Sequence, residues 1–194
     1  MRKGFTLIEL LVVISIIVVL MFMVVPAFGL FARQRSLEGL GRVVKAAVLE
    51  ARSFSTTRRH IVRMIFGKKR IMLAEYFPAH LHKQGKYTYI ARHELPKRVD
   101  YLLYFMDINR GKEPFDDASE TTTEPSRVAI DHSIAFRPDG SVDFGRYTDV
   151  SHTLFEQNQK GDIVGYLHGQ KKVKCLVDIQ STIGSAEWKV VREK

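Results

Sequence analysis

Cysteine is almost absent from this sequence, which has one in 194 residues. A single thiol, Cys175, cannot form an intramolecular disulfide, so the fold has to be held together by its hydrophobic core. Free cysteines are among the most buried residue types, and we expect Cys175 to be a small buried side chain on a strand. The length of the chain leaves room for one modest globular domain besides any N-terminal segment.

The sequence also lacks residues spaced as in a catalytic or metal site. It has no glycine-rich phosphate loop. His80, His82 and His93 have no acid or cysteine nearby that would complete a ligand set. Asp116 and Asp117 lack the alternating aspartate and asparagine spacing of a calcium loop. We therefore interpret these residues as loop residues, and expect no enzyme activity, no metal and no cofactor.

Charge is nearly missing from the apolar segment over residues 5–25. At about 1.5 Å per helical residue, a helix of this length crosses a hydrocarbon layer about 30 Å thick. Glu9 is the only charged residue in it. Because an ionised carboxylate at membrane depth costs about 2.5–3.5 kcal/mol, Glu9 needs a partner. The nearby chain supplies none, since Arg2 and Lys3 lie on the other side of Gly4.

The stretch from Lys3 to Glu9, Lys-Gly-Phe-Thr-Leu-Ile-Glu, resembles the class III signal of type IV prepilins and type II secretion pseudopilins. The resemblance implies that a prepilin peptidase cuts between Gly4 and Phe5, that the new amine of Phe5 is N-methylated, and that Glu9 acts in filament assembly. The carboxylate of one subunit could then neutralise the Phe5 amine of its neighbour. Other pilin-like subunits are the partners that the resemblance implies.

Two alternative interpretations of this N-terminus stay open. A secretory signal peptide also begins with basic residues, and Val25-Pro26-Ala27 is compatible with its cleavage site, but the apolar run is too long and contains an acid. A plain signal anchor tolerates the length but does not explain Gly4, Phe5 and Glu9. Cations are more numerous after the segment than before it, which favours the opposite orientation. The processing signal requires a cytoplasmic N-terminus, so we expect a single-pass inner (cytoplasmic) membrane protein with a periplasmic C-terminal domain.

Positive charge is concentrated in one segment. Residues 31–70 carry eleven lysines or arginines against two glutamates, whereas residues 71–194 carry 17 basic against 18 acidic residues. A solvated helix face near anionic lipid headgroups explains such a segment. The alternative is nucleic-acid binding, supported by the same cluster and by the basic tail of Lys189, Arg192 and Lys194.

Hydrophobic spacing predicts one long helix followed by strands. Helical periodicity extends to about residue 54, with an apolar stripe in the second half (Leu37, Leu40, Val44, Ala47, Ala51 and Phe54) and Glu38 four residues before Arg42. Short β-like runs follow, at 61–66, 71–77, 87–91, 99–106, 127–130, 133–136, 141–144, 163–167, 173–179 and 186–191. Residues 107–126 and 147–162 are predicted loops, the first long for a compact domain and without an assigned role.

The predicted fold class is α+β. A long N-terminal helix, with a transmembrane half and an amphipathic half, packs on an antiparallel β-sheet domain. The corresponding domains are a leader over 1–4, a transmembrane and stalk helix over 5–54, and a β-rich periplasmic domain over 55–194.

The hairpin at Phe136-Arg-Pro-Asp-Gly-Ser141 and Gly184 before the last strand resemble the GspH/FimT group of minor pseudopilins and minor pilins. The chain has neither the cysteine pair of type IVa major pilins nor the calcium loop of major pseudopilins, which favours a minor subunit. The resemblance implies a pilin-like fold and a minor subunit of a type II secretion pseudopilus. The alternative is a minor pilin of a type IV pilus that contacts DNA during uptake.

Overall fold

The computed structural model describes residues 7–78, 85–118, 120, 123–157 and 160–193, with only the backbone described at residues 23 and 25–33. The chain forms two compact units, Met1–Arg35 and Ser36–Lys194.

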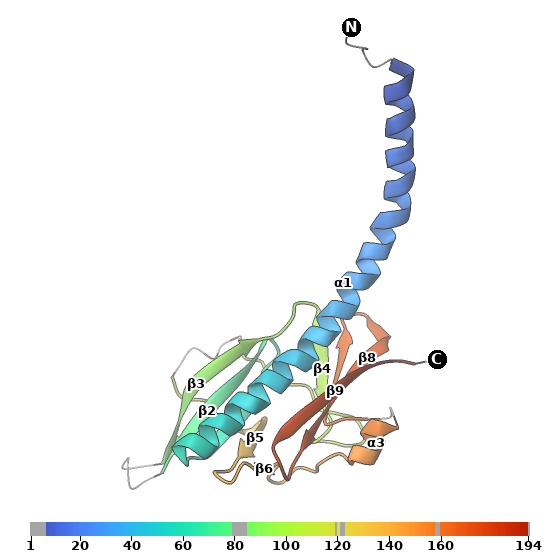
Figure 1. Ribbon diagram of the computed structural model, residues 1–194. Helices are drawn as coiled ribbons and strands as arrows, with labels where there is room; N and C mark the ends of the chain where they lie inside the picture. The colour runs from blue at the N-terminus through green and yellow to red at the C-terminus, as the bar shows by residue number, and fades with distance from the viewer. Residues whose placement is uncertain (1–6, 79–84, 119, 121–122, 158–159, 194) are drawn as a thin grey trace. The chain divides into compact units, whose positions relative to one another are not determined.

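The first element, α1, is a single helix over Leu7–Arg58 (Figure 1). It therefore continues four residues beyond the predicted end at residue 54. In its last turns, the hydroxyl groups of Ser55 and Thr56 donate to the carbonyl oxygen of Arg52 at 3.1 and 3.0 Å, which satisfies a carbonyl near the end of the helix. Arg59 has a positive φ of 57°, in the left-handed region in which many helices end.

The strands form two antiparallel sheets. Sheet 1 has the order β3-β2-β1-β5-β6, and sheet 2 has the order β4-β7-β8-β9. The bounds in sheet 1 are β1 Val62–Phe66, β2 Arg70–Phe77, β3 Lys86–Glu94, β5 Ser133–Phe136 and β6 Val142–Asp143. In sheet 2 they are β4 Val99–Leu103, β7 Ile163–Leu167, β8 Gln170–Gln180 and β9 Ser185–Arg192. Two short helices, α2 Arg127–Asp131 and α3 His152–Glu156, lie between strands. The predicted α+β class with antiparallel pairing is confirmed.

The sheet 1 strands include two hairpins, and the second contains the predicted hairpin at Phe136–Ser141. In the first, β1 pairs with β2, and Gly67 N–H donates to the carbonyl oxygen of Arg70 at 3.0 Å across the turn. In the second, β5 pairs with β6, and Gly140 at φ 86° takes the left-handed position that the Pro-Asp-Gly sequence predicts. Gly184 lies against this turn, because a Cβ there would be 2.4 Å from the carbonyl oxygen of Gly140. The two features behind the GspH/FimT resemblance therefore meet in space.

The strand predicted at 127–130 is wrong, because these residues form helix α2. Ser126 caps that helix, its side-chain oxygen accepting a hydrogen bond from the backbone N–H of Ala129 at 3.2 Å. Two further boundaries differ from the prediction. Strand β4 ends at Leu103, short of residue 106, and the predicted loop over 147–162 contains α3.

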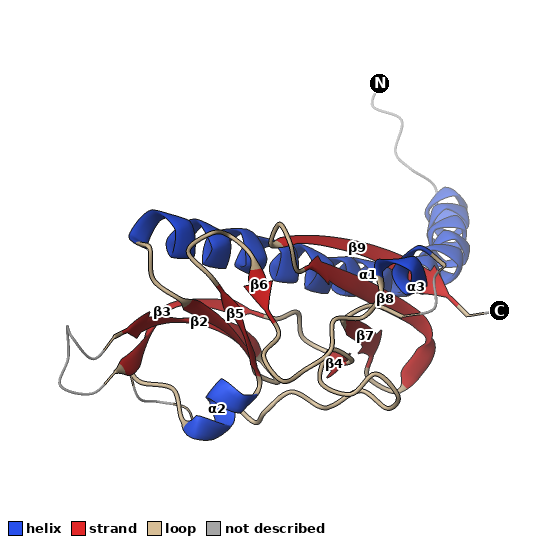
Figure 2. Cartoon of the chain, turned by 90° about the horizontal axis from the view of Figure 1, so that it is seen from below, coloured by secondary structure: helices blue, strands red, loops and turns tan. Residues whose placement is uncertain are grey.

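The core of the Ser36–Lys194 unit lies between the second half of α1 and the two sheets (Figure 2). Leu37, Leu40, Val44, Ala47 and Ala51, all on the predicted stripe, have no exposed surface. They share one hydrophobic cluster with side chains from both sheets, including Phe66, Phe136 and Val177. Cys175 belongs to this cluster and is fully buried, as predicted.

The helix and sheet 2 approach each other closely at Gly41. A Cβ at this position would be 2.5 Å from ring atoms of Trp188 on β9, closer than real Cβ contacts come. The absence of a side chain at Gly41 therefore lets the indole pack directly on the helix backbone.

Candidate assembly segment

The residues predicted to act in processing and assembly lie at the N-terminus. Gly4 and Phe5 are outside the described residues, so cleavage and methylation there stay predictions. Glu9 is described: it lies in the first turn of α1 and is exposed. A carboxylate in a first turn interacts favourably with the partial positive charge of the helix N-terminus, so Glu9 is compatible with helix formation.

The helix after Glu9 presents an apolar surface on every side. Each described side chain from Leu7 to Phe22 is exposed, up to 83% for Leu7 and 79% for Phe22. A continuous exposed apolar surface of this kind marks a region that contacts another molecule or a membrane. We call residues 7–22 the assembly segment.

Among the helices that the described residues form, none is both long and apolar enough to cross a membrane, so the crossing predicted over residues 5–25 is not confirmed.

Several cations of the basic segment serve the globular unit internally. The Arg58 guanidinium lies 2.6 Å from one oxygen of the buried Glu75 carboxylate, and His60 Nδ1 lies 2.8 Å from the other. Arg63 donates to the Tyr87 hydroxyl at 2.7 Å from its Nε. Because the Arg58 charge is offset by the Glu75 carboxylate within the fold, the count of cations in residues 31–70 overstates the net positive charge that a polyanion would meet.

The basic tail is also partly engaged. The Lys189 ammonium lies 4.1 Å from the centre of the Phe155 ring, a cation–π contact. Lys194 is outside the described residues. Nucleic-acid binding stays a prediction.

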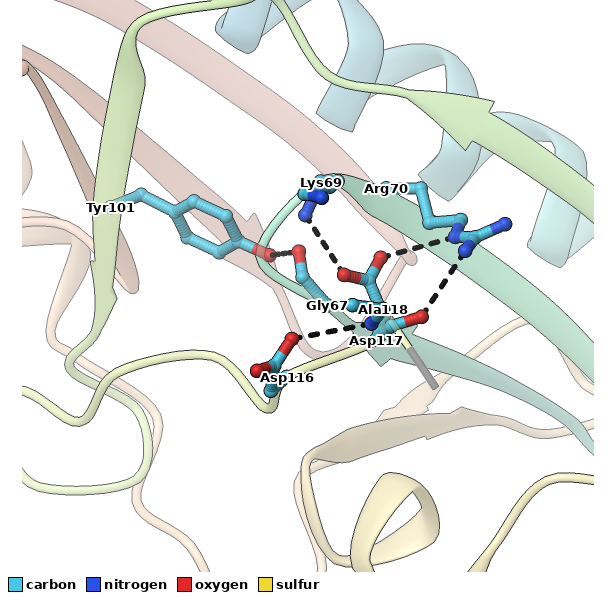
Figure 3. Close-up of polar contacts among 7 residues, drawn as sticks. All are labelled: Gly67, Lys69, Arg70, Tyr101, Asp116, Asp117 and Ala118. Atoms are coloured by element: carbon cyan, nitrogen blue, oxygen red, sulfur yellow. Dashed lines mark hydrogen bonds and ion pairs between the residues drawn. The ribbon is translucent and has the colours of Figure 1, made fainter. Parts of the chain in front are cut away.

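The long predicted loop over 107–126 is anchored to the β1–β2 turn by Asp117 (Figure 3). This side chain is fully buried; one carboxylate oxygen accepts from the Lys69 backbone N–H and the other from Arg70 Nε, both at 3.2 Å. The Asp117 carbonyl oxygen accepts a further bond from Arg70 Nη2 at 3.1 Å. Asp117 therefore has a structural role, with its oxygens directed at the chain's own donors.

Tyr101 ties the same turn to β4. Its hydroxyl donates to the Gly67 carbonyl oxygen at 2.7 Å, and burial raises the pKa of this hydroxyl well above its ordinary value (Figure 3). Asp116 accepts a hydrogen bond from the backbone N–H of Ala118 at 3.2 Å. The turn, the loop and β4 are thus fixed to one another by polar contacts.

The three histidines weighed as metal ligands are not brought together in what the structure describes. His80 and His82 lie outside the described residues. His93 Nε2 is 2.6 Å from a carboxylate oxygen of Glu50 on α1, close enough for an ion pair, although the two groups are not aligned for a hydrogen bond. Within the described ranges, no three histidine, cysteine, aspartate or glutamate side chains form a group that could hold a metal ion.

A network of buried carboxylates near α3 was not predicted. Asp162 has no exposed surface, and Asp178 on β8 is almost fully buried. Burial raises the pKa of Asp162, of Asp178 and of the neighbouring Asp149. The sequence did carry one signal, since Asp178 interrupts the otherwise apolar run from Cys175 to Ile179.

Comparison with known families matches residues 1–25 to the prokaryotic N-terminal methylation motif. No curated protein and no solved structure matches the chain. The motif confirms the resemblance drawn from Lys3 to Glu9 and supports a type IV pilin-like subunit that is processed by a prepilin peptidase and assembles with other pilin subunits.

Proposed function

We propose that this chain is a minor pilin-like subunit of a type II secretion pseudopilus, cut between Gly4 and Phe5 and assembled through its N-terminal helix. One observation carries the proposal: the methylation motif leads directly into an apolar helix whose described side chains are exposed. A segment of this composition needs an apolar partner, and the N-terminal helices of neighbouring pilin-like subunits provide one.

Glu9 gives the assembly its register. Cleavage after Gly4 would create a cationic amine at Phe5, and in a packed bundle of apolar helices the Glu9 carboxylate of one subunit would pair with that amine of the next. An unpaired carboxylate in an apolar environment costs about 2.5–3.5 kcal/mol, so arrangements that leave Glu9 unpaired are disfavoured. The pairing thus selects one axial position of a subunit against its neighbour.

Before assembly, the unprocessed chain is proposed to be held in the inner membrane with residues 36–194 in the periplasm. The support is the methylation motif together with the apolar sequence over residues 5–25. Assignment to the minor subunits of a pseudopilus rests on the Gly140 turn and on Gly184 beside it. A minor pilin of a type IV pilus is the alternative, and the partner subunits that co-purify with the chain distinguish the two.

The test is a Glu9→Ala substitution in cells that contain the prepilin peptidase and the other subunits. We expect normal cleavage, with Edman degradation starting at Phe5, but loss of co-purification with other subunits. Glu38→Ala is the matched control, because Glu38 is a glutamate of the same helix outside the assembly segment. Mature protein that starts at Met1 or at Phe28, or filaments that contain the Glu9→Ala protein at the normal level, would overturn the proposal.

A further inference from the structure

The globular unit, Ser36–Lys194, has one end at which the chain enters it. There the start of the second half of α1 lies against the β3–β4 loop, since a Cβ at Gly39 would be 3.0 Å from a ring carbon of Pro96. At the opposite end, a Cβ at Gly184 would be 3.5 Å from the Arg52 side chain, near the end of α1. We call the first of these the entry end.

Three segments of the chain form the entry end. Strand β4, which follows the β3–β4 loop, pairs with β7, so the loop lies beside the β7–β8 turn. The His168 backbone N–H donates to the carbonyl oxygen of Arg98 at 3.0 Å and links the two. The Glu193 backbone N–H donates to the carbonyl oxygen of Lys172 at 2.8 Å, which adds the end of β9. Both views show β9 running along the second half of α1 (Figures 1 and 2). The loop, the turn and the end of β9 therefore make one surface.

Exposed cations gather on this surface. They come from the β3–β4 loop, the start of β8 and the end of β9, and none of them belongs to the basic segment over residues 31–70. The register of sheet 2 places the end of β9 beside the start of β8, because Val173 lies opposite Arg192. The five side chains, all exposed and called the entry patch below, are Lys97, Arg98, Lys171, Lys172 and Arg192.

Acidic side chains of the same segments offset this charge only in part. The Asp100 carboxylate lies 2.8 Å from His168 Nδ1, and the Glu193 carboxylate forms an ion pair with the Lys174 ammonium. Glu94, at the end of β3, is exposed. Neither of the two paired carboxylates has its printed partner in the entry patch, and the patch therefore carries a net positive charge.

The backbone of Arg98 supports a binding role for its side chain. Its φ is 68°, in the left-handed region that glycine adopts freely and that other residues adopt at a steric cost. Backbone strain of this kind persists where the surrounding structure holds it, and it is concentrated at functional sites. The hydrogen bond from His168 holds the loop here. Arg98 thus brings a cation to a position whose backbone favours glycine.

The place of the entry patch in the chain selects its partner. In the proposed function, residues 5–25 hold the unassembled chain in the inner membrane, and ten residues, 26–35, separate that segment from Ser36. Ten helical residues span about 15 Å, and the headgroup region adds about 5–7 Å to each side of the hydrocarbon layer. The remaining gap is about one Debye length at physiological salt, and long lysine and arginine side chains bridge it. Anionic lipids attract cations at such a distance, and each strengthens binding about fivefold.

We propose that the entry patch binds the anionic phospholipid headgroups of the membrane that holds the unassembled chain. The bound headgroups fix the β3–β4 loop and the β7–β8 turn against the bilayer surface, and so orient the globular unit before assembly. This inference rests on the proposed function, because it requires residues 5–25 to lie in a bilayer. It adds to that function a lipid class as partner and a second contact with the membrane, made by the β-rich domain.

Nuclear magnetic resonance of the full, uncleaved chain in lipid nanodiscs tests the entry patch. The discs contain phosphatidylcholine alone or with phosphatidylglycerol, and in both a trace of lipid carries a paramagnetic headgroup. We expect phosphatidylglycerol to raise the paramagnetic relaxation of the amides at residues 168–172 about twofold or more. The amide of Gly184, at the opposite end, should not change. The difference between the lipids should disappear in 1 M salt, where the Debye length is about 3 Å.

Two failures of this experiment have different meanings. A chain that inserts into both bilayers but relaxes equally at residues 168–172 would overturn the entry patch and leave the proposed function intact. A chain that inserts into neither bilayer would overturn the membrane-held state, and the entry patch with it. Duplex DNA added to the phosphatidylcholine discs is the competing polyanion. A response of residues 168–172 to DNA, without a response to phosphatidylglycerol, would assign the patch to nucleic acid and overturn lipid binding.

Charge reversal separates the entry patch from the charge of the whole chain. Lys171→Glu combined with Lys172→Glu replaces two exposed side chains, so the fold should stay intact while the effect of phosphatidylglycerol is lost. Lys112→Glu is the matched control, because Lys112 is exposed and its backbone pairs with Leu103, at the end of β4 away from the entry end. It should keep the full effect. A double variant that responds to phosphatidylglycerol like the parent chain would contradict the proposal.

Discussion

The two halves of α1 have the same secondary structure and opposite surroundings. In the assembly segment, every described apolar side chain from Leu7 to Phe22 is exposed. In the half from Ser36 to Arg58, the apolar stripe is buried against two sheets of the same chain. The comparison shows that helix formation alone does not decide the role of a hydrophobic residue. That role depends on where the apolar partner comes from. The second half packs against sheets of the same chain, and the exposed first half requires an apolar partner outside the chain.

The largest difference between the two halves of α1 is expected when a leucine in each half is replaced by alanine. Leu40→Ala removes a fully buried side chain, and we expect it to lower the free energy of unfolding by about 2–5 kcal/mol. Leu11→Ala removes a side chain that is 58% exposed, and should leave the unfolding free energy within about 0.5 kcal/mol while weakening assembly. Denaturant unfolding followed by the fluorescence of Trp188, the single tryptophan, measures both. Equal effects of the two substitutions would contradict the division of α1.

A smaller effect is expected where the second half meets sheet 2. Gly41→Ala would place a methyl group against the Trp188 ring, and overpacking of this kind costs about 1–3 kcal/mol. The better helix propensity of alanine offsets about 1 kcal/mol of that cost. We expect a net loss of about 1 kcal/mol with a shift in Trp188 emission. Leu49→Ala, at a position 50% exposed on the same helix, should change neither, and a stabilised Gly41→Ala protein would refute the contact.

The smallest effect belongs to the surface of the second half. Glu38 and Arg42 form an ion pair at 3.3 Å, one helical turn apart. The Arg42 side chain is largely exposed, so we expect Arg42→Ala to cost only about 0.3–0.5 kcal/mol, and less at high salt. A loss above about 1 kcal/mol that salt does not reduce would show that Arg42 also packs against the core.

Local patterns in the sequence predicted much of this fold. The helical spacing of apolar residues from Leu37 to Phe54 predicted which face of the helix is buried, because this spacing depends only on residues close together in the sequence. The Pro-Asp-Gly turn gave the second hairpin for the same reason. Helix α2 was missed because Arg-Val-Ala-Ile has the composition of a strand, and the signal that outweighed it was the capping Ser126.

Contacts between residues far apart in the sequence could not be predicted from local patterns. Strand β5 pairs with β1 across about 70 residues of sequence, and this pairing places β5 and β6 in sheet 1. The contact of Asp117 with Arg70 joins residues 47 apart in the sequence, and that of Asp162 with Ile179 joins residues 17 apart. Among the functional residues, those in the N-terminal motif could be predicted because the motif is contiguous. The contacts of the buried carboxylates Asp162 and Asp178 could not, since these residues meet their partners only in the folded chain.

The reactivity of Cys175 reports whether the globular unit is folded. Its side chain is fully enclosed, and burial raises the pKa of the thiol to about 12, so the reactive thiolate is scarce while the fold is intact. Because Cys175 is the single cysteine, the amount of modification by a thiol reagent measures the fraction of molecules in which the core around Cys175 has opened. Because buried Cys175 does not react in the folded chain, a thiol-directed probe would label only a cysteine introduced at a surface position.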